Sequence, residues 1–510
     1  MRVYGIVSKV RTTAVYAINI IFLTLVSVSI IGAIALIPDL FTQISGWVVG
    51  IVDVFWIITV ACILSKKLRL FISQMIRSVI TKMRGYKKFV LTITAFIIVI
   101  WQIFLVYNLS GWSGWDPSFL TAAATYKVVE DSYFSVYPNV VFQLFINHFV
   151  WILTGQQSRE TLIIILNLLN ILMLDTALLL LLKSLRKLFN GRYLCETAVL
   201  GLLIIGLSPY VAIPYTDIIA FLLSSIAIYL VVVLKNIRSK QKRVFVLISL
   251  GLVMVLSYMT KPSLLIFYMA IIIAIVLFLN KSSLKNCFIS SLILTITIAF
   301  SVFGIHYFMA HQDYININHE IREPATHFIA MGMTGKGGFN GKDIKDDTSI
   351  ETYKERNDAN KQKIKKRLKK FGNVTNYQKF LFTKQINNTS DGSFAWGVEG
   401  GFLKLFDIND NIGSRFVMKM YAKNGQALNN TFEFRFLIQI VWLIVLVLCW
   451  FSTFINNRFS IILKLTIVGF MLFLLFFEGG RSRYVIQFLP FIIMTIPYGL
   501  MAIDNLKKRI

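Results

Sequence analysis

The chain has 510 residues, of which 56% are hydrophobic, and its mean hydropathy is +0.69. A water-soluble protein of this length and hydropathy would expose large apolar patches, so the composition excludes a soluble globular protein. The net charge of +27 would suggest nucleic acid in a soluble protein, but here the basic residues lie in short stretches between apolar segments. We therefore predict an all-α polytopic membrane protein without a nucleic-acid partner.

Twelve apolar segments approach the ~20 residues that a helix needs to cross a bilayer. The sequence therefore predicts about twelve transmembrane helices. The segments are residues 12–37, 47–64, 89–107, 160–182, 194–212, 217–235, 244–259, 264–280, 286–306, 434–452, 460–477 and 484–501.

Basic clusters alternate with the apolar segments in a way that predicts the topology. If both termini are cytoplasmic, every cluster lies in a cytoplasmic loop or tail, as the positive-inside rule requires. This assignment holds only if residues 140–153 do not cross the membrane. That stretch contains Gln143, Asn147 and His148, so we predict an interfacial or re-entrant helix there. The basic clusters begin at Arg2, Lys66, Lys183, Lys235, Lys281, Arg458 and Lys507.

Two long external segments then divide the chain. Residues 1–306 form a predicted membrane domain, whose first external loop (108–159) bears interfacial helices and carries the candidate catalytic residues. Residues 307–432 form a predicted external loop domain, with a basic helix at about 351–370, and residues 433–510 hold the last three transmembrane helices. A segment as long as 307–432 is unusual without structure of its own, so we expect it to fold.

The first external loop holds the carboxylates that we consider for catalysis. Asp116 follows an apolar segment, lies between aromatic residues and precedes a proline, so it is either a helix cap or a functional carboxylate at the lipid headgroup level. Glu130 and Asp131 form a second acidic pair. The YFSVYPN stretch that follows, with Tyr133 and Tyr137, is otherwise an ordinary interfacial turn.

Charged residues also lie at the outer ends of other predicted helices. An acidic or basic side chain within a span costs roughly 2.5–3.5 kcal/mol on insertion scales, so Asp217 and Lys261 are functional candidates unless they extend to the interface. Arg481 and Arg483 form either an outer ion-pair cluster with Glu478 or a phosphate clamp, since guanidinium matches phosphate oxygens. We expect the charges to lie at the ends of spans rather than in mid-bilayer.

Together these motifs resemble the glycosyltransferase C superfamily, polytopic enzymes that take a sugar from a polyprenyl-phosphate donor, such as protein mannosyltransferases and lipid A aminoarabinose transferases. The resemblance rests on Asp116 in the first external loop, on YFSVYPN closing that loop, and on an R-x-R-Y-x-x-x-x-x-P signature opening the last helix. PYTD, KPS, THFIAMGMTGKGGFN and SDGSFAWGVEG look like a Gram-positive branch of these enzymes. The Asp-Glu pair typical of protein mannosyltransferases is Asp-Pro here, so their acceptor and metal behaviour need not transfer.

The resemblance implies an inverting displacement in which one carboxylate is the general base, and Asp116 is the first choice. Glu130 and Asp131 are the second choices, as base or as ligands of a divalent cation, which is left open as a cofactor; no metal site is assigned. Cations would stabilise the leaving phosphate, and aromatic and polar side chains would recognise the sugar. The predicted substrate-binding residues are Tyr133, Tyr137, Asn139, Lys261, Arg481 and Arg483, with His327, Asn340 and Trp396 as weaker candidates.

His327 is equally compatible with an ordinary packed histidine, a metal ligand or a proton carrier. The implied partners are a polyprenyl-phosphate sugar, membrane lipids and an envelope acceptor (teichoic acid, wall polysaccharide, lipid or protein), together with a donor-synthesising glycosyltransferase and a flippase. The expected location is the cell membrane, with the active site on the external face. Two alternatives stay open: a lipid-linked polysaccharide polymerase, which would need external arginines such as Arg322 and Arg356, and a twelve-helix secondary transporter.

Overall fold

The computed structural model describes residues 2–72, 74–75, 86–126, 132–279, 284–399, 403–406, 411–421 and 433–509. In this part of the chain, nine helices are long and apolar enough to cross a membrane. They are α1 (Arg2–Phe41), α2 (Gly46–Leu64), α4 (Lys87–Leu109), α8 (Arg159–Phe189), α10 (Thr216–Asn236), α11 (Lys240–Thr260), α13 (Leu284–His311), α20 (Glu433–Phe451, continued by η8, Ser452–Phe454) and α21 (Arg458–Phe476).

The three remaining apolar segments are also helical but are short or bent. α9 (Leu194–Gly201) runs into the π-helical turn η2 (Leu202–Gly206), and α12 (Leu265–Leu277) follows the 3₁₀ turn η4 (Pro262–Leu264). At the C-terminus, η9 (Ser482–Phe488) and α22 (Leu489–Ile493) meet α23 (Ile496–Lys507) at a 51° bend, which makes a tenth span if the pair is counted as one. The predicted all-α multi-pass fold is therefore confirmed.

The first external loop folds onto the membrane helices. It contains β1 (Gly111–Trp112), α5 (Asp116–Ala124), α6 (Ser132–Val136), η1 (Pro138–Val140) and α7 (Val141–Leu153). α7 is the helix that we expected to lie at the interface or re-enter; it is 13 residues long, too short to span, and it packs against α5 and α8. Its Asn147 is fully buried and accepts a hydrogen bond from Gln143 at 2.7 Å, which gives these polar side chains a structural role.

The long second segment is largely helical as well. After η3 (Pro209–Ala212) in the earlier part of the chain, the second segment contributes η6 (His319–Ile321), α14 (Ala325–Met331), α15 (Gly341–Thr348), α16 (Tyr353–Lys370), α17 (Val374–Thr389), α18 (Trp396–Glu399), β2 (Lys404–Leu405) and α19 (Ile412–Tyr421). α16 is the predicted basic helix. β2 pairs antiparallel with β1, Gly111 opposite Leu405, and so joins the two external segments.

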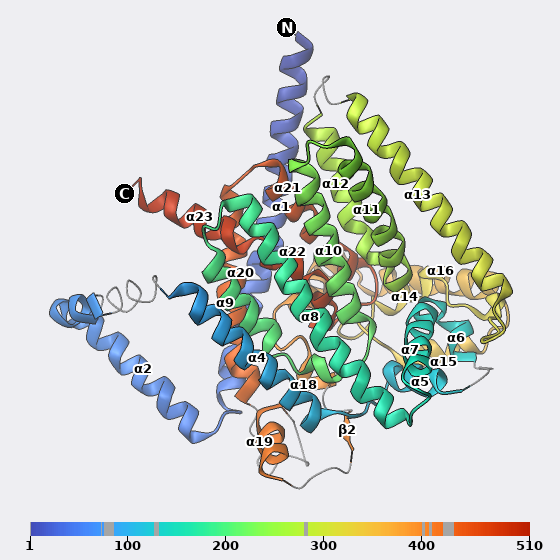
Figure 1. Cartoon of the computed structure of the whole chain (residues 1–510), viewed down its shortest axis with the longest axis horizontal. Coiled ribbons are helices and arrows are strands. Elements are labelled where there is room, and N and C mark those ends of the chain that lie inside the picture. The colour runs from blue at the N-terminus through green and yellow to red at the C-terminus, as the bar shows by residue number, and fades with distance from the viewer. Residues whose placement is uncertain are drawn as a thin grey trace.

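The elements of the two external segments gather on one side of the helix bundle. Figure 1 shows α5, α6 and α7 beside α14, α15 and α16 at the lower right, near the end of α13, while both chain termini lie on the opposite side. The core forms where α10 packs against α8 and α11, and where α1 packs against α20, α21 and α17. α2 stands apart at the left and is little buried.

Candidate functional site

The outer ends of α5 and α10 meet through a hydrogen bond. Asp116 starts α5, and Tyr215 precedes α10 in an extended conformation; the Tyr215 hydroxyl donates to Asp116 Oδ2 at 2.7 Å. Burial, with the negative charge of Asp116 adding to it, raises the pKa of Tyr215 well above its usual range, so its hydroxyl stays protonated and donates. Asp116 is half-buried and its second oxygen is left for another partner.

A second carboxylate lies beside this pair and organises two cations. Asp217, in the first turn of α10 and 2% exposed, forms an ion pair with Lys261, the residue that ends α11. Arg483 approaches it from η9, with Nε 3.7 Å from Asp217 Oδ2. Three elements far apart in sequence therefore place Asp217, Lys261 and Arg483 in one cluster at the outer face.

Aromatic rings enclose the Arg483 guanidinium. Its Cζ lies 4.2 Å from the Trp115 ring centroid and 5.4 Å from those of Tyr215 and Tyr484. Trp115 and Tyr215 themselves pack edge to face at 5.1 Å. Because Trp115 precedes Asp116 and also contacts Arg483, the carboxylate of α5 and the cations of α11 and η9 belong to one site.

Arg481 and Arg483 diverge although only one residue separates them. The chain is extended at Arg481 and becomes a 3₁₀ helix at Ser482. Arg481 Nη2 lies 3.4 Å from Glu478 Oε1, which also accepts from the Tyr484 hydroxyl at 3.1 Å, whereas Arg483 faces Asp217. Arg481 is the more exposed of the two arginines, with 24% of its side chain accessible against 5% for Arg483.

The aromatic pair of YFSVYPN lies next to this cluster. Tyr133 stacks on Phe119 of α5 at 4.7 Å and contacts the Tyr137 ring at 5.4 Å. Burial raises the pKa of Tyr137, and the negative charges of Glu323, Asp116 and Glu478 raise it further. Tyr137 thus lies among carboxylates from three parts of the chain, while Asn139 is exposed on η1.

Close backbone contacts fix the loop that carries Glu478 and Arg481. The Gly479 amide donates to the Gly337 carbonyl at 2.9 Å, and a Cβ on Gly338 would lie 2.7 Å from the Gly479 carbonyl. Gly480 has φ +73°, a conformation that favours glycine. The glycine-rich loop of the second external segment therefore docks directly on the outer start of the last helix.

Lys384 of α17 secures the same junction from inside. It is 1% exposed and donates to the carbonyls of Gly332 at 2.6 Å, Leu475 at 3.0 Å and Phe477 at 2.7 Å. Burial lowers the pKa of this ammonium group to about 8. Leu475 lies near the end of α21, where carbonyls lack partners within the helix, so Lys384 caps that end from a distance.

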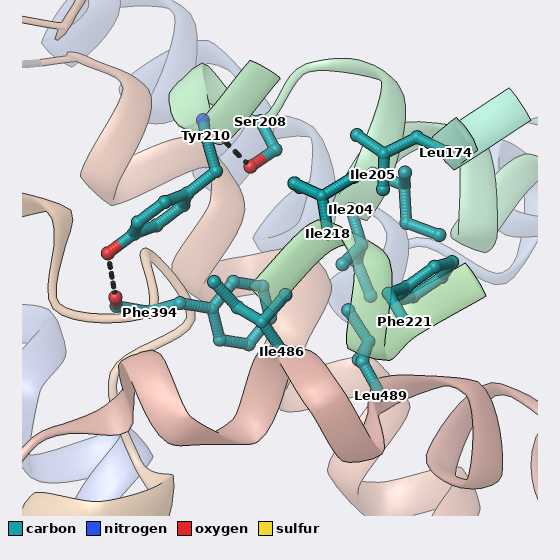
Figure 2. A pocket seen from close by; sticks show the side chains of 10 residues that line it. All are labelled: Leu174, Ile204, Ile205, Ser208, Tyr210, Ile218, Phe221, Phe394, Ile486 and Leu489. Carbon is teal, nitrogen blue, oxygen red and sulfur yellow. Dashed lines mark hydrogen bonds between the residues drawn. The ribbon is translucent and has the colours of Figure 1, made fainter. Parts of the chain in front are cut away.

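A small apolar cavity lies one helical turn inward from the charged cluster. Ile218, next to Asp217, and Ile486, one turn after Arg483, line it together with Phe394 (Figure 2). Tyr210 borders it and donates from its hydroxyl to the Phe394 carbonyl at 2.6 Å. The remaining lining residues are Leu174, Ile204, Ile205, Ser208, Phe221 and Leu489.

Not all of the predicted residues belong to this site. Glu130 and Asp131 lie outside the described residues. Trp396 is 1% exposed and donates from its indole to the Tyr421 carbonyl at 2.7 Å, so it is part of the core rather than a sugar-facing ring. Asn340 caps α15 through a 3.0 Å bond to the Lys342 amide, and His327 is fully buried within the second external segment.

The expectation that charges avoid the middle of the spans is wrong for two residues. Asp175 lies near the middle of α8 and accepts a hydrogen bond from Gln102 of α4 at 3.2 Å. Lys464 of α21 is fully buried and donates to Asn19, Thr453, Ile455 and Asn456 at 2.8–3.1 Å. Polar partners on neighbouring helices compensate the cost of burying them. The lone Asp and Lys within apolar runs were the available signals.

The comparisons with known proteins address the chain as a whole. Residues 10–501 match the model of a family described as conserved hypothetical integral membrane protein. The chain belongs to this family. No curated protein and no solved structure matches it. The family match and the apolar helices agree on a multi-pass integral membrane protein.

Proposed function

We propose that this integral membrane protein is a glycosyltransferase that moves a sugar from a polyprenyl-phosphate donor to a hydroxyl of an envelope acceptor at the external face. The observation that carries the proposal is the bridge made by Tyr215. Its hydroxyl binds Asp116 and its ring contacts the Arg483 guanidinium, so a candidate base and candidate phosphate-binding cations adjoin. An inverting transfer from a phosphate needs these two features side by side.

In the proposed reaction, the acceptor oxygen attacks the anomeric carbon while Asp116 takes the hydroxyl proton. The bond from the anomeric carbon to the phosphate oxygen breaks, and the phosphate keeps the electron pair. Lys261 and Arg481 are the cations with exposed side-chain surface, and Arg483 supplies a fixed charge behind them. Since phosphate leaves without being protonated, one carboxylate is sufficient; glycosidases need two because their leaving alkoxide takes a proton.

The polymerase alternative loses one of its anchors. Arg356 is 2% exposed and donates to the carbonyls of Ile350 and Ile321, so it is committed to the interior of the second external segment. The exposed Arg322 stacks over Tyr353 at 4.8 Å. A lipid-linked polysaccharide polymerase would therefore have a single external arginine of this pair to present.

A secondary transporter is the second candidate, because of Asp175. A carboxylate within a span is a usual element of an ion or proton pathway. The Asp175 side chain contacts Gln102 between α4 and α8, away from the outer cluster. Transport and transfer therefore place the essential carboxylate at different positions, Asp175 or Asp116.

The test uses a donor-independent readout. Purified protein in nanodiscs is incubated with a lipid extract and an envelope fraction from its source membranes, and mass spectrometry follows each polyprenyl-phosphate sugar and free polyprenyl phosphate. We expect one sugar lipid to disappear as polyprenyl phosphate accumulates, in the wild type and in Asp175→Asn. No conversion in the wild type, together with Asp175-dependent uptake of a solute in proteoliposomes, would replace the transferase with a transporter.

A further inference from the structure

Three ionisable side chains converge in the interior of the second external segment. Glu323 lies just before α14, His327 within α14 and Asp347 within α15, and none of the three side chains is exposed. His327 Nδ1 is 2.5 Å from Asp347 Oδ2 and 3.4 Å from Glu323 Oε2. The three potential ligand atoms all lie within 4.8 Å of one another.

The other oxygen of each carboxylate is held by a cation of α16. Lys363 Nζ lies 2.5 Å from Asp347 Oδ1, and Arg356 Nη1 lies 3.5 Å from Glu323 Oε1. These contacts leave Oδ2 and Oε2 directed at the imidazole. Partners on the outer oxygens that orient the inner ones are the usual surroundings of a metal-binding carboxylate.

Two atoms at this point need a partner. Among the described residues no donor makes a hydrogen bond to Glu323 Oε2, and the Asn360 Oδ1 atom is likewise buried without one. A buried polar atom left unpaired carries a penalty of about 1–3 kcal/mol, more for a charged group. Asn360 Nδ2 is 2.5 Å from Asp347 Oδ2, so rotation of the amide would bring its oxygen toward the same point.

The charges also leave room for a cation. Asp346 lies 3.9 Å from Lys363, so three carboxylates (Glu323, Asp346 and Asp347) face two cations (Arg356 and Lys363). The group therefore carries a net negative charge while His327 is neutral. Either an imidazolium or a bound metal ion supplies the missing positive charge, and the unpartnered oxygens distinguish them, since one ring proton cannot reach both carboxylates.

We propose that Glu323, His327 and Asp347 bind one Zn²⁺ ion, with Asn360 as the fourth ligand. One nitrogen and two carboxylate oxygens suit zinc, whose ligands lie at about 2.0–2.2 Å and therefore some 3.4 Å from one another in a tetrahedron. The His327–Glu323 separation already has this value, and the His327–Asp347 contact must open by about 1 Å. Mg²⁺ and Ca²⁺ need six or more oxygen ligands, which this group does not offer.

Complete burial makes the ion structural rather than catalytic. It would join α14, α15 and α16, and the backbone amide of Glu323 donates to the Val136 carbonyl at 3.1 Å, which extends the connection to the first external loop. This proposal is independent of the proposed sugar transfer, because it concerns a site with no exposed atom.

The test measures metal content and stability of the full-length protein. Protein purified without chelator is analysed by inductively coupled plasma mass spectrometry. We expect about one zinc ion per chain in the wild type and less than a tenth of that in His327→Gln. Exposure to 1,10-phenanthroline in detergent should lower the Tm of the wild type, and added ZnCl₂ should restore it, while His327→Gln responds to neither.

The matched control is Asp343→Asn. Asp343 belongs to the same helix as Asp347 and binds Arg367 through both oxygens, at 2.6 and 2.9 Å, but it is no member of the cluster. This variant should lose stability yet keep its zinc. If the folded wild type holds no transition metal and its Tm is indifferent to chelator and zinc, the cluster is an imidazolium ion network and the proposal is overturned; zinc retained in His327→Gln overturns it equally.

Discussion

The Tyr215 hydroxyl donates a 2.7 Å hydrogen bond to Asp116 Oδ2 across 99 residues of sequence. This contact holds the carboxylate in one orientation and occupies one of its oxygens, so the other is the one that would accept a proton. The same tyrosine ring lies against the guanidinium of Arg483. Tyr215 therefore positions both halves of the proposed site.

Tyr215→Phe should lower the transfer rate by roughly ten- to a hundred-fold. The change removes a hydrogen bond to a carboxylate, about 1.5–3 kcal/mol at 1.4 kcal/mol per decade, but keeps the ring. The rate at saturating donor is the quantity to measure. Tyr421→Phe is the control, because it deletes a 2.9 Å hydroxyl bond to the Leu207 carbonyl elsewhere. Equal rates in the two variants would deny Tyr215 a positioning role.

The Asp217–Lys261 pair should be strongly coupled in stability. Removing one partner of a buried pair costs about 3–5 kcal/mol, and removing both costs less than the sum. Asp217→Asn and Lys261→Met should each lower Tm in detergent, and the double variant should not add the two losses. The Asp358–Lys361 pair, whose side chains are 54% exposed, is the control and should show no such coupling. Additive losses at Asp217 and Lys261 would contradict the ion pair.

Arg483→Ala should raise the donor concentration needed for half-maximal transfer by roughly ten- to a hundred-fold, since a charge-assisted contact contributes about 1.5–3 kcal/mol. Arg483→Lys should recover only part, because an ammonium does not reproduce a planar fork. Arg481→Ala should have the smaller effect, since Arg481 also pairs with Glu478. An unchanged donor dependence in correctly folded Arg483→Ala would reduce Arg483 to an interfacial anchor.

The external position of the site is tested by labelling. Single cysteines at Lys240 and Lys354 are introduced after replacement of the four native cysteines, all of which are free thiols. An impermeant maleimide applied to intact cells should label position 354 and spare position 240, since the basic end of α11 is predicted to be cytoplasmic. Labelling at position 240 before cell disruption would invert the topology.

Much of the fold could be predicted because long apolar runs have few alternatives in a membrane. All twelve predicted segments are helical, and Gln143, Asn147 and His148 marked α7 as a helix that does not span. The basic helix α16 was likewise predictable from its polarity and length. These are local properties, which a single sequence carries.

The pairings within the site are not local, and they could not be predicted. Nothing in PYTD indicates that Tyr215 reaches Asp116, or that Asp217 faces both Lys261 and Arg483, because those contacts depend on how α5, α10, α11 and η9 pack. Asp175 is a different case. Its place in an apolar run was visible, and the expectation of charge-free span centres led to its omission.

The most direct test of the proposed transfer is the rate of Asp116→Asn in nanodiscs with the polyprenyl-phosphate sugar as donor. The amide is nearly isosteric but accepts no proton, so the rate should fall by about 10²- to 10⁴-fold while Tm and membrane insertion stay close to those of the wild type. Asp116→Glu should keep a small part of the activity. A folded Asp116→Asn protein that transfers sugar at the wild-type rate would contradict the account, because Asp116 would then not be the base.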